Sequence, residues 1–424
     1  MRILVIGSGG REHALVWKLN QSPRVRLILC APGNGGMAQS ARCVDVNTDD
    51  FSAVSDLVHR EKIDFVLIGP EAPLAAGLAD FLHASGIAVL GPTKNAAQLE
   101  SSKIFSKDFM RRHNIPTADY NTFQDPQSAL CYLKSSDTHY PIVVKADGLA
   151  AGKGVVVAQN EQEASDAVER MMIRKEFGSA GERIVIEDCL KGMEASYIVF
   201  TDGETILPAA ASRDHKAIFD GDKGPNTGGM GTYSTNDILG SDLEQEVLER
   251  IIQPTINGMR QEGNPFRGIL YAGLMLTEQG VQVLEFNVRM GDPEGQVILP
   301  RLRSDFAELC EALCQGRLKD YKAEWNPGAA VCVVLASGGY PGSYSKGKVI
   351  TGLDMAEEDD RIAIFHAGTQ QSGENLVTSG GRVLGVTAVD HDLASSIMAA
   401  YEGVNKIHFE GMQYRRDIGA KGLK

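Results

Sequence analysis

The chain has 424 residues, of which 43% are hydrophobic and 23% charged, so it can form two to four domains with buried cores. Its net charge of −13 argues against a nucleic-acid partner, which would need a basic surface. No apolar run reaches membrane-spanning length and an apolar strand follows the first residue, so we expect no membrane partner and a reducing, cytoplasmic location. The 7 cysteines are scattered without a Cys-x-x-Cys motif, which indicates neither a zinc site nor a disulfide framework.

The first part of the chain alternates predicted strands and helices. Four short apolar runs each end in a loop rich in glycine or proline: residues 3–6, 25–30, 65–68 and 87–90. Helical segments separate them, which predicts a parallel α/β sheet. Ligands of such sheets bind at the carboxyl ends of the strands.

Two further regions and a closing one follow a helical connector at residues 103–122. A small region has predicted helices at 125–134 and 161–177 and strands at 142–145, 155–157 and 184–187. A larger region has predicted strands at 195–200, 206–211, 268–277 and 281–286, helices at 243–262 and 305–315, and a polar glycine loop at 221–231. Short strands and glycine turns fill the last region from residue 329, with one helix at 393–404. These elements predict an α/β protein, α+β overall.

The first glycine loop, Gly7-Ser8-Gly9-Gly10-Arg11-Glu12, lies between a predicted strand and helix. Glu12 stands where a dinucleotide-binding loop needs its third glycine, which argues against a nicotinamide cofactor. Backbone amides of Gly9 and Gly10 at a helix start, beside Arg11, are suited to an anion such as a sugar phosphate. The alternative is a tight strand-to-helix turn without a ligand.

A second glycine-rich segment, residues 145–154, has lysines at its base and tip. It fails the Walker pattern because its spacing is one residue short and Gly154 replaces the hydroxyl residue. We interpret it as a mobile lid over a triphosphate, with Lys145, Gly152 and Lys153 meeting phosphate oxygens. The alternative is an exposed flexible hairpin.

Two polar segments offer weaker signals. The strand and loop at residues 184–194 could present backbone groups to an adenine edge and Glu194 to a ribose, although a solvated charged loop is the more frequent meaning. In the segment 212–231, Asp214 is the better candidate to accept a substrate ammonium group, because a lone histidine such as His215 is more often structural.

The segment 280–296 concentrates groups suited to charged substrates. Glu285 and Asn287 are two apart on a predicted strand, so they share a face and offer hard oxygen ligands to Mg²⁺. Arg289 can bind a carboxylate or phosphate with two hydrogen bonds, and Asp292 and Glu294 add acceptors on the following turn. This pattern indicates phosphoryl transfer; the alternative is an edge strand ending in a polar turn.

Taken in order, these motifs closely resemble the phosphoribosylamine–glycine ligase family, ATP-grasp enzymes of purine biosynthesis. The resemblance rests on residues 9–14, 69–74, 214–216, 224–231 and 285–294 and extends to runs at 337–342, 366–369 and 379–384. It implies an ATP-grasp fold with an N-terminal parallel α/β (pre-ATP-grasp) domain at 1–102. It further implies a large lobe at 103–122 and 190–325, a lid lobe at 123–189 and a C-terminal β-rich domain at 326–424.

The resemblance also implies the reaction and its site. ATP, glycine and 5-phosphoribosylamine would give glycinamide ribonucleotide, ADP and phosphate through a glycyl phosphate. Glu285 and Asn287 would hold Mg²⁺, with Mn²⁺ as a substitute. The remaining implied positions are, for ATP, Lys103, Lys145, Glu187, Leu190 and Glu194; for phosphoribosylamine, Gly9, Gly10, Arg11, Glu12, Pro70 and Glu71; and for glycine and catalysis, Asp214, Arg289, Asp292 and Glu294.

Three alternatives remain open from the sequence. The first is another ATP-grasp ligase or carboxylase acting on a purine intermediate. The second is a non-catalytic nucleotide-binding protein, against which Glu285, Asn287 and Lys145 argue, and the third is a dehydrogenase. A monomer or weak dimer is expected. Two departures from the family pattern stand near the site, Ala217 in place of an arginine and Met290 in place of a phenylalanine.

Overall fold

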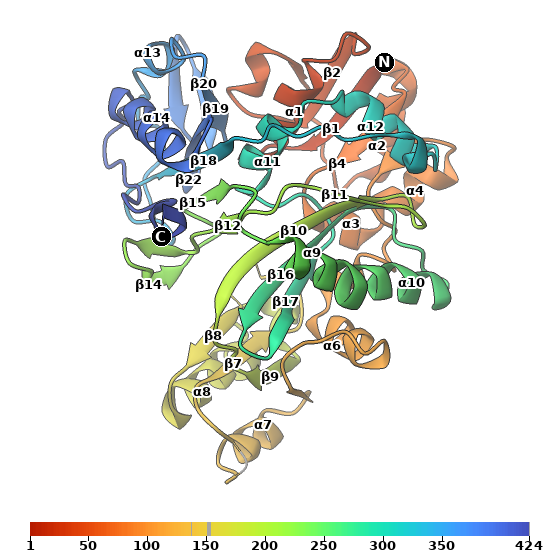
Figure 1. Ribbon diagram of the computed structural model, residues 1–424, viewed down its shortest axis with the longest axis vertical. Coiled ribbons are helices and arrows are strands. Elements are labelled where there is room, and N and C mark those ends of the chain that lie inside the picture. The colour runs from red at the N-terminus through yellow and green to blue at the C-terminus, as the bar shows by residue number, and fades with distance from the viewer. Residues whose placement is uncertain (137, 151–153, 424) are drawn as a thin grey trace.

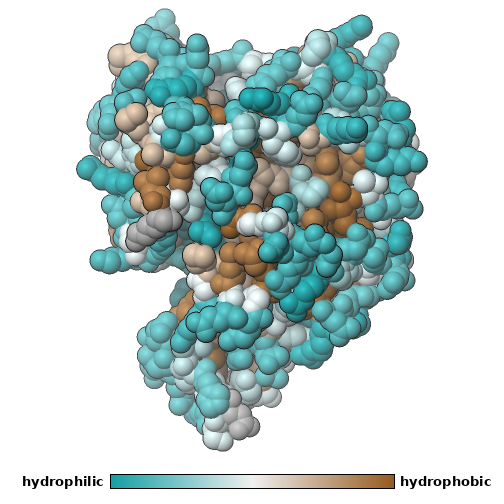
Figure 2. Space-filling model, in the orientation of Figure 1, coloured by the Kyte–Doolittle hydropathy of each residue, from teal (hydrophilic) through white to brown (hydrophobic). Residues whose placement is uncertain are grey.

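The computed structural model describes residues 1–136, 138–150 and 154–423. Figure 1 shows the N-terminal and C-terminal parts side by side at the top, a central sheet beneath them and a smaller lobe at the bottom. In Figure 2 the same small lobe projects below a broad body, with a notch between the two on the left side of this view. In the part of the chain that the structure describes, no helix combines the length and apolar character needed to cross a bilayer.

The N-terminal sheet has five parallel strands in the order β3-β2-β1-β4-β5, which confirms the predicted parallel α/β arrangement. Its strands are β1 (Arg2–Gly7), β2 (Leu27–Pro32), β3 (Arg42–Cys43), β4 (Phe65–Ile68) and β5 (Ala88–Leu90). Its helices are α1 (Gly10–Leu19), α2 (Phe51–Glu61), α3 (Glu71–Ala76) and α4 (Leu78–Ala84). Because β1 lies between β2 and β4, the loops that follow these three strands meet at one edge of the sheet.

The small lobe is an antiparallel sheet backed by helices. Two connecting helices, α5 (Gln98–Ser101) and α6 (Lys103–Arg112), precede it. The sheet order is β6-β9-β7-β8, formed by β6 (Tyr120–Phe123), β7 (Ile142–Ala146), β8 (Val155–Ala158) and β9 (Ile184–Asp188). Helix α7 (Pro126–Leu133) and helix α8 (Glu161–Val168) pack on it, and a π-helical turn continues α8 over Glu169–Ile173. The helix predicted over 161–177 therefore ends earlier, shortly before Lys175, which has a positive φ of 51°.

The central sheet is antiparallel, in the order β11-β10-β16-β17. Its strands are β10 (Met193–Thr201), β11 (Ile206–Pro208), β16 (Gly268–Thr277) and β17 (Gly280–Asn287). Helix α9 (Ser241–Val247), a π-helical turn (Leu248–Ile252) and helix α10 (Gln253–Gln261) form the segment predicted as one helix, and α12 (Phe306–Cys314) closes the region. Helix α11 (Gly295–Arg301) lies outside the predicted elements, because its seven residues with Pro300 give no helical period.

The C-terminal sheet combines strands from two regions of the chain, in the order β12-β15-β18-β22-β19. Its later elements are β18 (Ala329–Ala336), α13 (Leu353–Ala356), β19 (Ile362–His366), β20 (Thr369–Ser372), β21 (Asn375–Thr378), β22 (Arg382–Asp390) and α14 (Leu393–Lys406). Two earlier strands, β12 (Arg213–Asp214) and β15 (Gly231–Ser234), extend it, while β13 (Ala217–Phe219) and β14 (Lys223–Asn226) form a separate hairpin. The segment 221–231 is predicted as a polar glycine loop that cannot form a core. Its last residue, Gly231, begins the buried strand β15, because β15 pairs with β18.

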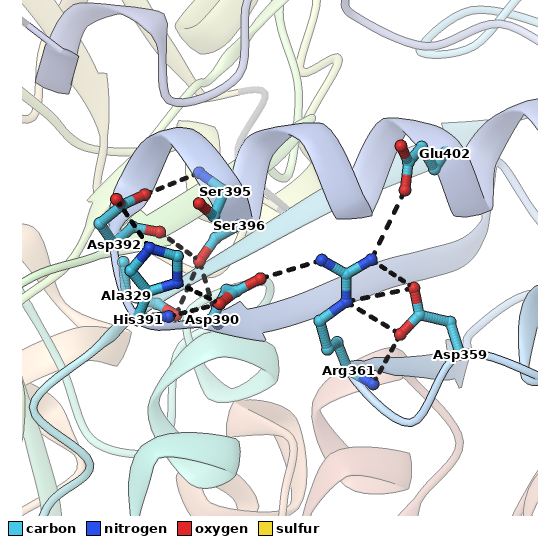
Figure 3. Close-up of polar contacts among 9 residues, drawn as sticks. All are labelled: Ala329, Asp359, Arg361, Asp390, His391, Asp392, Ser395, Ser396 and Glu402. Atoms are coloured by element: carbon cyan, nitrogen blue, oxygen red, sulfur yellow. Dashed lines mark hydrogen bonds and ion pairs between the residues drawn. The ribbon is translucent and has the colours of Figure 1, made fainter.

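An ion-pair network fixes the outer edge of this domain (Figure 3). Arg361, immediately before β19, lies 2.7 Å from Asp359, 3.0 Å from Asp390 at the end of β22 and 3.6 Å from Glu402 on α14. Asp392 caps α14 by accepting a hydrogen bond from the Ser395 amide at 2.8 Å. The network therefore ties two strands and a helix together on the surface.

A second cluster ties the C-terminal segment to the hairpin β13–β14. The fully buried Arg415 donates to the Ala217 carbonyl at 3.1 Å and pairs with Asp417 at 2.7 Å and Asp222 at 3.0 Å. Asp417 in turn accepts from the Gly221 amide at 2.8 Å. These contacts hold the hairpin against the C-terminal domain.

Replacing Arg415 by alanine is expected to lower the free energy of unfolding by about 2–3 kcal/mol, since charged hydrogen bonds and a buried aliphatic stem are lost together. Chemical denaturation of the wild type, Arg415→Ala and Arg415→Met would measure it, with the methionine variant recovering only the packing part. The exposed neighbour Arg416 provides the control, because Arg416→Ala removes a similar side chain outside the cluster. Equal stability of Arg415→Ala and wild type would contradict the assigned role.

Candidate active site

The end of β17 meets three lysines from other elements. The Glu285 carboxylate lies 3.4 Å from Lys103 Nζ at the start of α6, and burial of the carboxyl is outweighed by Lys103, Lys216 and Lys145, which lower its pKa to about 2. Lys145, on β7, also donates to the Leu284 carbonyl at 3.1 Å. Glu285 is therefore ionised at neutral pH and surrounded by positive charge that exceeds its own.

Arg289 lies at the centre of a second polar group. Its guanidinium is 3.2 Å from Glu71 at the start of α3, 2.7 Å from Glu100 on α5 and 3.2 Å from Asn287 Oδ1. Glu100 also accepts the Val288 amide at 2.8 Å. The structure thus brings Glu285, Asn287, Arg289 and Glu71 to one place, at the junction of the N-terminal and central sheets.

The turn after β17 lies against the strands of the C-terminal sheet. Asp292 accepts a hydrogen bond from Gln296 at 2.8 Å and lies 3.4 Å from the Arg382 guanidinium. Glu294 is buried and accepts hydrogen bonds from Ser196 and Tyr271, each at 3.2 Å. Arg382 also donates to the carbonyls of Asp292 and Gly228 at 2.8 and 2.6 Å. Arg382 therefore binds the turn and the glycine loop to β22.

Asp214 lies beside this turn at the end of β12. A Cβ placed on Gly229 would be 2.9 Å from Asp214 Oδ1 and 2.4 Å from Pro293, so the glycine loop passes between them. Burial, and then the neighbouring Glu294 carboxylate, raise the pKa of Asp214 well above its usual range. The next residue, His215, is buried and donates a hydrogen bond through Nδ1 to the Gly231 carbonyl at 3.2 Å, and burial lowers its pKa to about 4, which suits a structural role.

The raised pKa of Asp214 has a consequence for stability. A carboxyl with a raised folded-state pKa contributes stability that is present below its unfolded pKa and lost as the pH rises through the folded value. Asp214→Asn is therefore expected to raise the melting temperature at neutral pH by about 2 °C, roughly 1 kcal/mol, with the gain vanishing below pH of about 4. Thermal unfolding at both pH values would measure it, with the exposed Asp237→Asn as a matched control; a lower melting temperature at neutral pH would contradict the assignment.

The nucleotide candidates lie where the small lobe joins the central sheet. Glu187, near the end of β9, has a buried side chain held between Lys145 and Lys107, each 2.5 Å away. Glu194, on β10, is exposed and lies 3.0 Å from Lys216. Leu190 is half-buried on the segment that joins β9 to β10. The predicted lid residues Gly152 and Lys153 lie outside the described residues.

In the loop after β1, the side chains of Arg11 and Glu12 form contacts within the protein. Glu12 is 2% exposed, pairs with Arg11 at 2.5 Å and accepts the Gly9 amide at 2.7 Å. Arg11 also donates to the Met290 carbonyl at 3.0 Å. The structure thus turns Arg11 and Glu12 inward, beneath the loop, while Ser8 is exposed. Gly10 lies at the start of α1, and Pro70 immediately precedes α3, whose first residue is Glu71.

The residues present fit a divalent metal that is shared with phosphate. Glu285 is an ionised carboxylate, and Asn287 Oδ1 accepts from a single donor among the described residues, Arg289, which leaves acceptor capacity. In residues 1–136, 138–150 and 154–423 there is no group of three or more His, Cys, Asp or Glu side chains placed to hold a metal. Two protein oxygens with substrate phosphates and water is the usual arrangement for Mg²⁺.

Several residues of this site are absent from the sequence predictions. Glu100 lies in a short helix and carries no motif, so only its contact with Arg289 reveals it. Lys107 approaches Glu187 through tertiary packing, and Arg382 lies 90 residues beyond Asp292 in the turn that it binds. The glycine-rich run containing Arg382 was itself visible in the sequence, and so was Lys216 next to Asp214.

Comparison with known families covers nearly all of the chain. Three family models match in order: Phosphoribosylglycinamide synthetase, N domain, at residues 1–100; its ATP-grasp (A) domain at 101–295; and its C domain at 330–421. Phosphoribosylamine–glycine ligases of Escherichia coli O157:H7 and Vibrio cholerae are 50% and 49% identical, over 100% of this chain and 99% of each relative. The trifunctional purine biosynthetic protein adenosine-3 of Gallus gallus is 50% identical, and this chain covers 42% of it.

Solved structures give the same result. Phosphoribosylamine–glycine ligase from Thermotoga maritima matches with a TM-score of 0.84 and 33% identity, over 98% of this chain and 100% of that one. A biotin carboxylase from Campylobacter jejuni matches with a TM-score of 0.73 and 13% identity, over 99% and 94% of the chains, which supports the fold alone. The resemblance inferred from the motifs is thereby confirmed, and the chain belongs to the phosphoribosylglycinamide synthetase family.

Proposed function

We propose that the protein joins glycine to 5-phosphoribosylamine at the expense of ATP, giving glycinamide ribonucleotide, ADP and phosphate in purine biosynthesis. The observation that carries the proposal is the convergence of Glu285, Asn287 and Arg289 with Lys103 and Lys145 from separate elements. Such a set suits a phosphoryl transfer to a carboxylate, and family membership supports this reaction over others with the same fold.

The chemistry requires no protein nucleophile. Phosphorylation of the glycine carboxylate gives an acyl phosphate, which the amine of phosphoribosylamine attacks with release of phosphate. The protein must align the reactants, balance the phosphate charge and keep water from the intermediate. Lys103 and Lys145 supply positive charge to the phosphates, and Mg²⁺ held by Glu285 and Asn287 would supply further charge neutralisation when bound.

The remaining roles follow from position. Arg289 is the candidate clamp for the glycine carboxylate, although Glu71 and Glu100 share its guanidinium. Asp214, with Asp292 and Glu294 beside it, is the candidate acceptor for ammonium groups. The Gly9 and Gly10 backbone with Pro70 and Glu71 would face the sugar phosphate, while Arg11 and Glu12 support that loop from within.

For the nucleotide, we propose that the adenine lies at Glu187 and Leu190, that the ribose meets Glu194, and that Lys145 meets the triphosphate. Lys216, 3.0 Å from Glu194, would add a positive charge near the nucleotide.

A single assay tests the proposal. ADP release is measured with ATP and Mg²⁺, with glycine and phosphoribosylamine each present or omitted, and the product is identified by mass. Turnover that needs both substrates and yields glycinamide ribonucleotide is expected. ADP release that depends on bicarbonate or on another carboxylate would instead favour the alternative of a different ATP-grasp ligase or carboxylase.

A further inference from the structure

Two cysteines lie opposite one another in the N-terminal sheet. Cys30 on β2 and Cys43 on β3 are register partners of a parallel pair, and the Val44 amide donates to the Cys30 carbonyl at 2.8 Å. Partners in adjacent strands are separated by about 4.8 Å and point to the same face. That separation falls within the roughly 4.4–6.8 Å that a disulfide needs between Cα atoms.

The side chains converge as the backbone predicts. A Cβ placed on Gly33 would be 2.4 Å from Cys43 Sγ and 3.0 Å from Cys30 Cβ, so both side chains lie against the same point of the loop after β2. Gly33 has a φ of +76°, which a glycine adopts without strain. Cys30 is fully buried and Cys43 is half-buried, so Cys43 is the more exposed of the two.

The two thiols differ in acidity. A hydrogen bond from Cys30, opposed by burial, lowers the pKa of Cys43 to about 7. The same hydrogen bond, together with burial, raises the pKa of Cys30 far above its usual range. Since thiolates attack disulfides and thiols do not, Cys43 is suited to react first and Cys30 to resolve the product.

We propose that Cys30 and Cys43 form a dithiol modification site that reacts with low-molecular-weight disulfides such as oxidised glutathione. The Cys43 thiolate attacks one sulfur, forms a mixed disulfide and releases one glutathione thiolate. Cys30 then loses its proton and attacks Cys43 Sγ, which expels the second glutathione. Two protein thiols are oxidised to one disulfide, and one glutathione disulfide is reduced to two glutathione molecules.

The modification would act on the loop after β2. Asn34 donates through Nδ2 to the Ser8 carbonyl at 2.9 Å and to the His366 carbonyl at 2.7 Å, and it accepts the Met37 amide at 3.0 Å. The loop therefore connects the first glycine loop with the C-terminal domain. An effect of oxidation on phosphoribosylamine binding rests on the proposed function, because it concerns the loops assigned to the sugar phosphate. Formation of the disulfide does not rest on the proposed function.

The experiment incubates the folded protein with oxidised glutathione, blocks remaining thiols and maps the peptides by mass spectrometry. We expect a Cys30–Cys43 cross-link with the loss of two hydrogens, reversed by dithiothreitol. Cys30→Ser is expected to stop at a glutathione adduct on Cys43, and Cys43→Ser to form neither product. Wild-type protein without the cross-link, or with adducts confined to the exposed Cys131, would overturn the proposal.

A matched control lies in the same chain. Cys310 and Cys314 are one helical turn apart on α12, and burial raises the pKa of Cys314 to about 12, so Cys314→Ser should leave the cross-link unchanged. In the oxidised wild type we expect a severalfold rise in the KM for phosphoribosylamine with no change in the KM for ATP. If the cross-link is mapped but the KM for phosphoribosylamine is unchanged, the proposed effect on the loop is wrong and the modification site stands. A protein without ligase turnover would instead contradict the proposed function.

Discussion

Replacing Glu285 by alanine is expected to reduce kcat/KM for glycine-dependent ADP release by about 10²–10³, the usual loss when one preorganised charge contact is removed. The variant leaves Lys103, Lys145 and Lys216 without their shared carboxylate and removes one of the two candidate metal ligands. A higher requirement for Mg²⁺ should accompany the loss, since Asn287 alone would remain. Steady-state rates over a Mg²⁺ titration would measure both effects.

The control for this prediction lies on the same strand. Gln282→Ala removes a polar side chain of similar size from β17, three residues before Glu285, and should leave the rate unchanged. Glu285→Gln separates charge from shape, because the amide retains one oxygen but not the negative charge. Near-wild-type turnover of Glu285→Ala with an unchanged Mg²⁺ requirement would remove Glu285 from the metal site.

Arg289→Ala is expected to lower both activity and stability, for two different reasons. Activity should fall by about 10²–10³ because the candidate clamp for the substrate carboxylate is lost. Stability should fall by about 3–5 kcal/mol because Glu100, whose side chain is 5% exposed, loses its buried partner. Burial already raises the pKa of Glu100, so the loss of stability should be smallest at acid pH and grow as the pH rises through the folded-state pKa.

A double variant separates these two effects. Arg289→Ala combined with Glu100→Gln removes the buried charge and should recover most of the stability measured by urea unfolding, while kcat/KM stays low. Glu100→Gln alone serves as the control for changes at that position. Recovery of activity along with stability would show that Arg289 supports the fold and does not bind substrate.

The fold could be predicted where each segment carries its own pattern. The N-terminal sheet follows from apolar runs that end in glycine or proline loops, β16 follows from a long apolar run, and β17 follows from its β-branched and aromatic residues. The family, and through it the reaction, follow from the order of several short motifs. The predicted glycine loop ends at residue 231 and no strand is predicted after it; β15 (Gly231–Ser234) is missing from the prediction because it is short and pairs with β18, about 100 residues later.

The site was predictable in its residue types but not in their pairings. Glu285 and Asn287 follow from strand periodicity, which is local. The inward position of Arg11 and Glu12 depends on three glycines, Gly7, Gly9 and Gly69, that leave room for the Glu12 side chain, and no local pattern reveals this. Glu100 and Arg382 act on residues that tertiary packing alone brings near them. The roles assigned to these residues stay predictions for the experiments above.

Strands from two regions of the chain form the C-terminal sheet, which limits where the chain can be cut into fragments that fold separately. Asp214 is carried by β12, which pairs with β15, and β15 pairs with β18, so its position depends on strands that come from both sides of residue 300. A truncation that keeps residues 1–328 would expose the edge of β15 and release the glycine-loop contact made by Arg382. The two fragments should therefore complement one another when mixed, rather than behave as a catalytic core and a dispensable appendage.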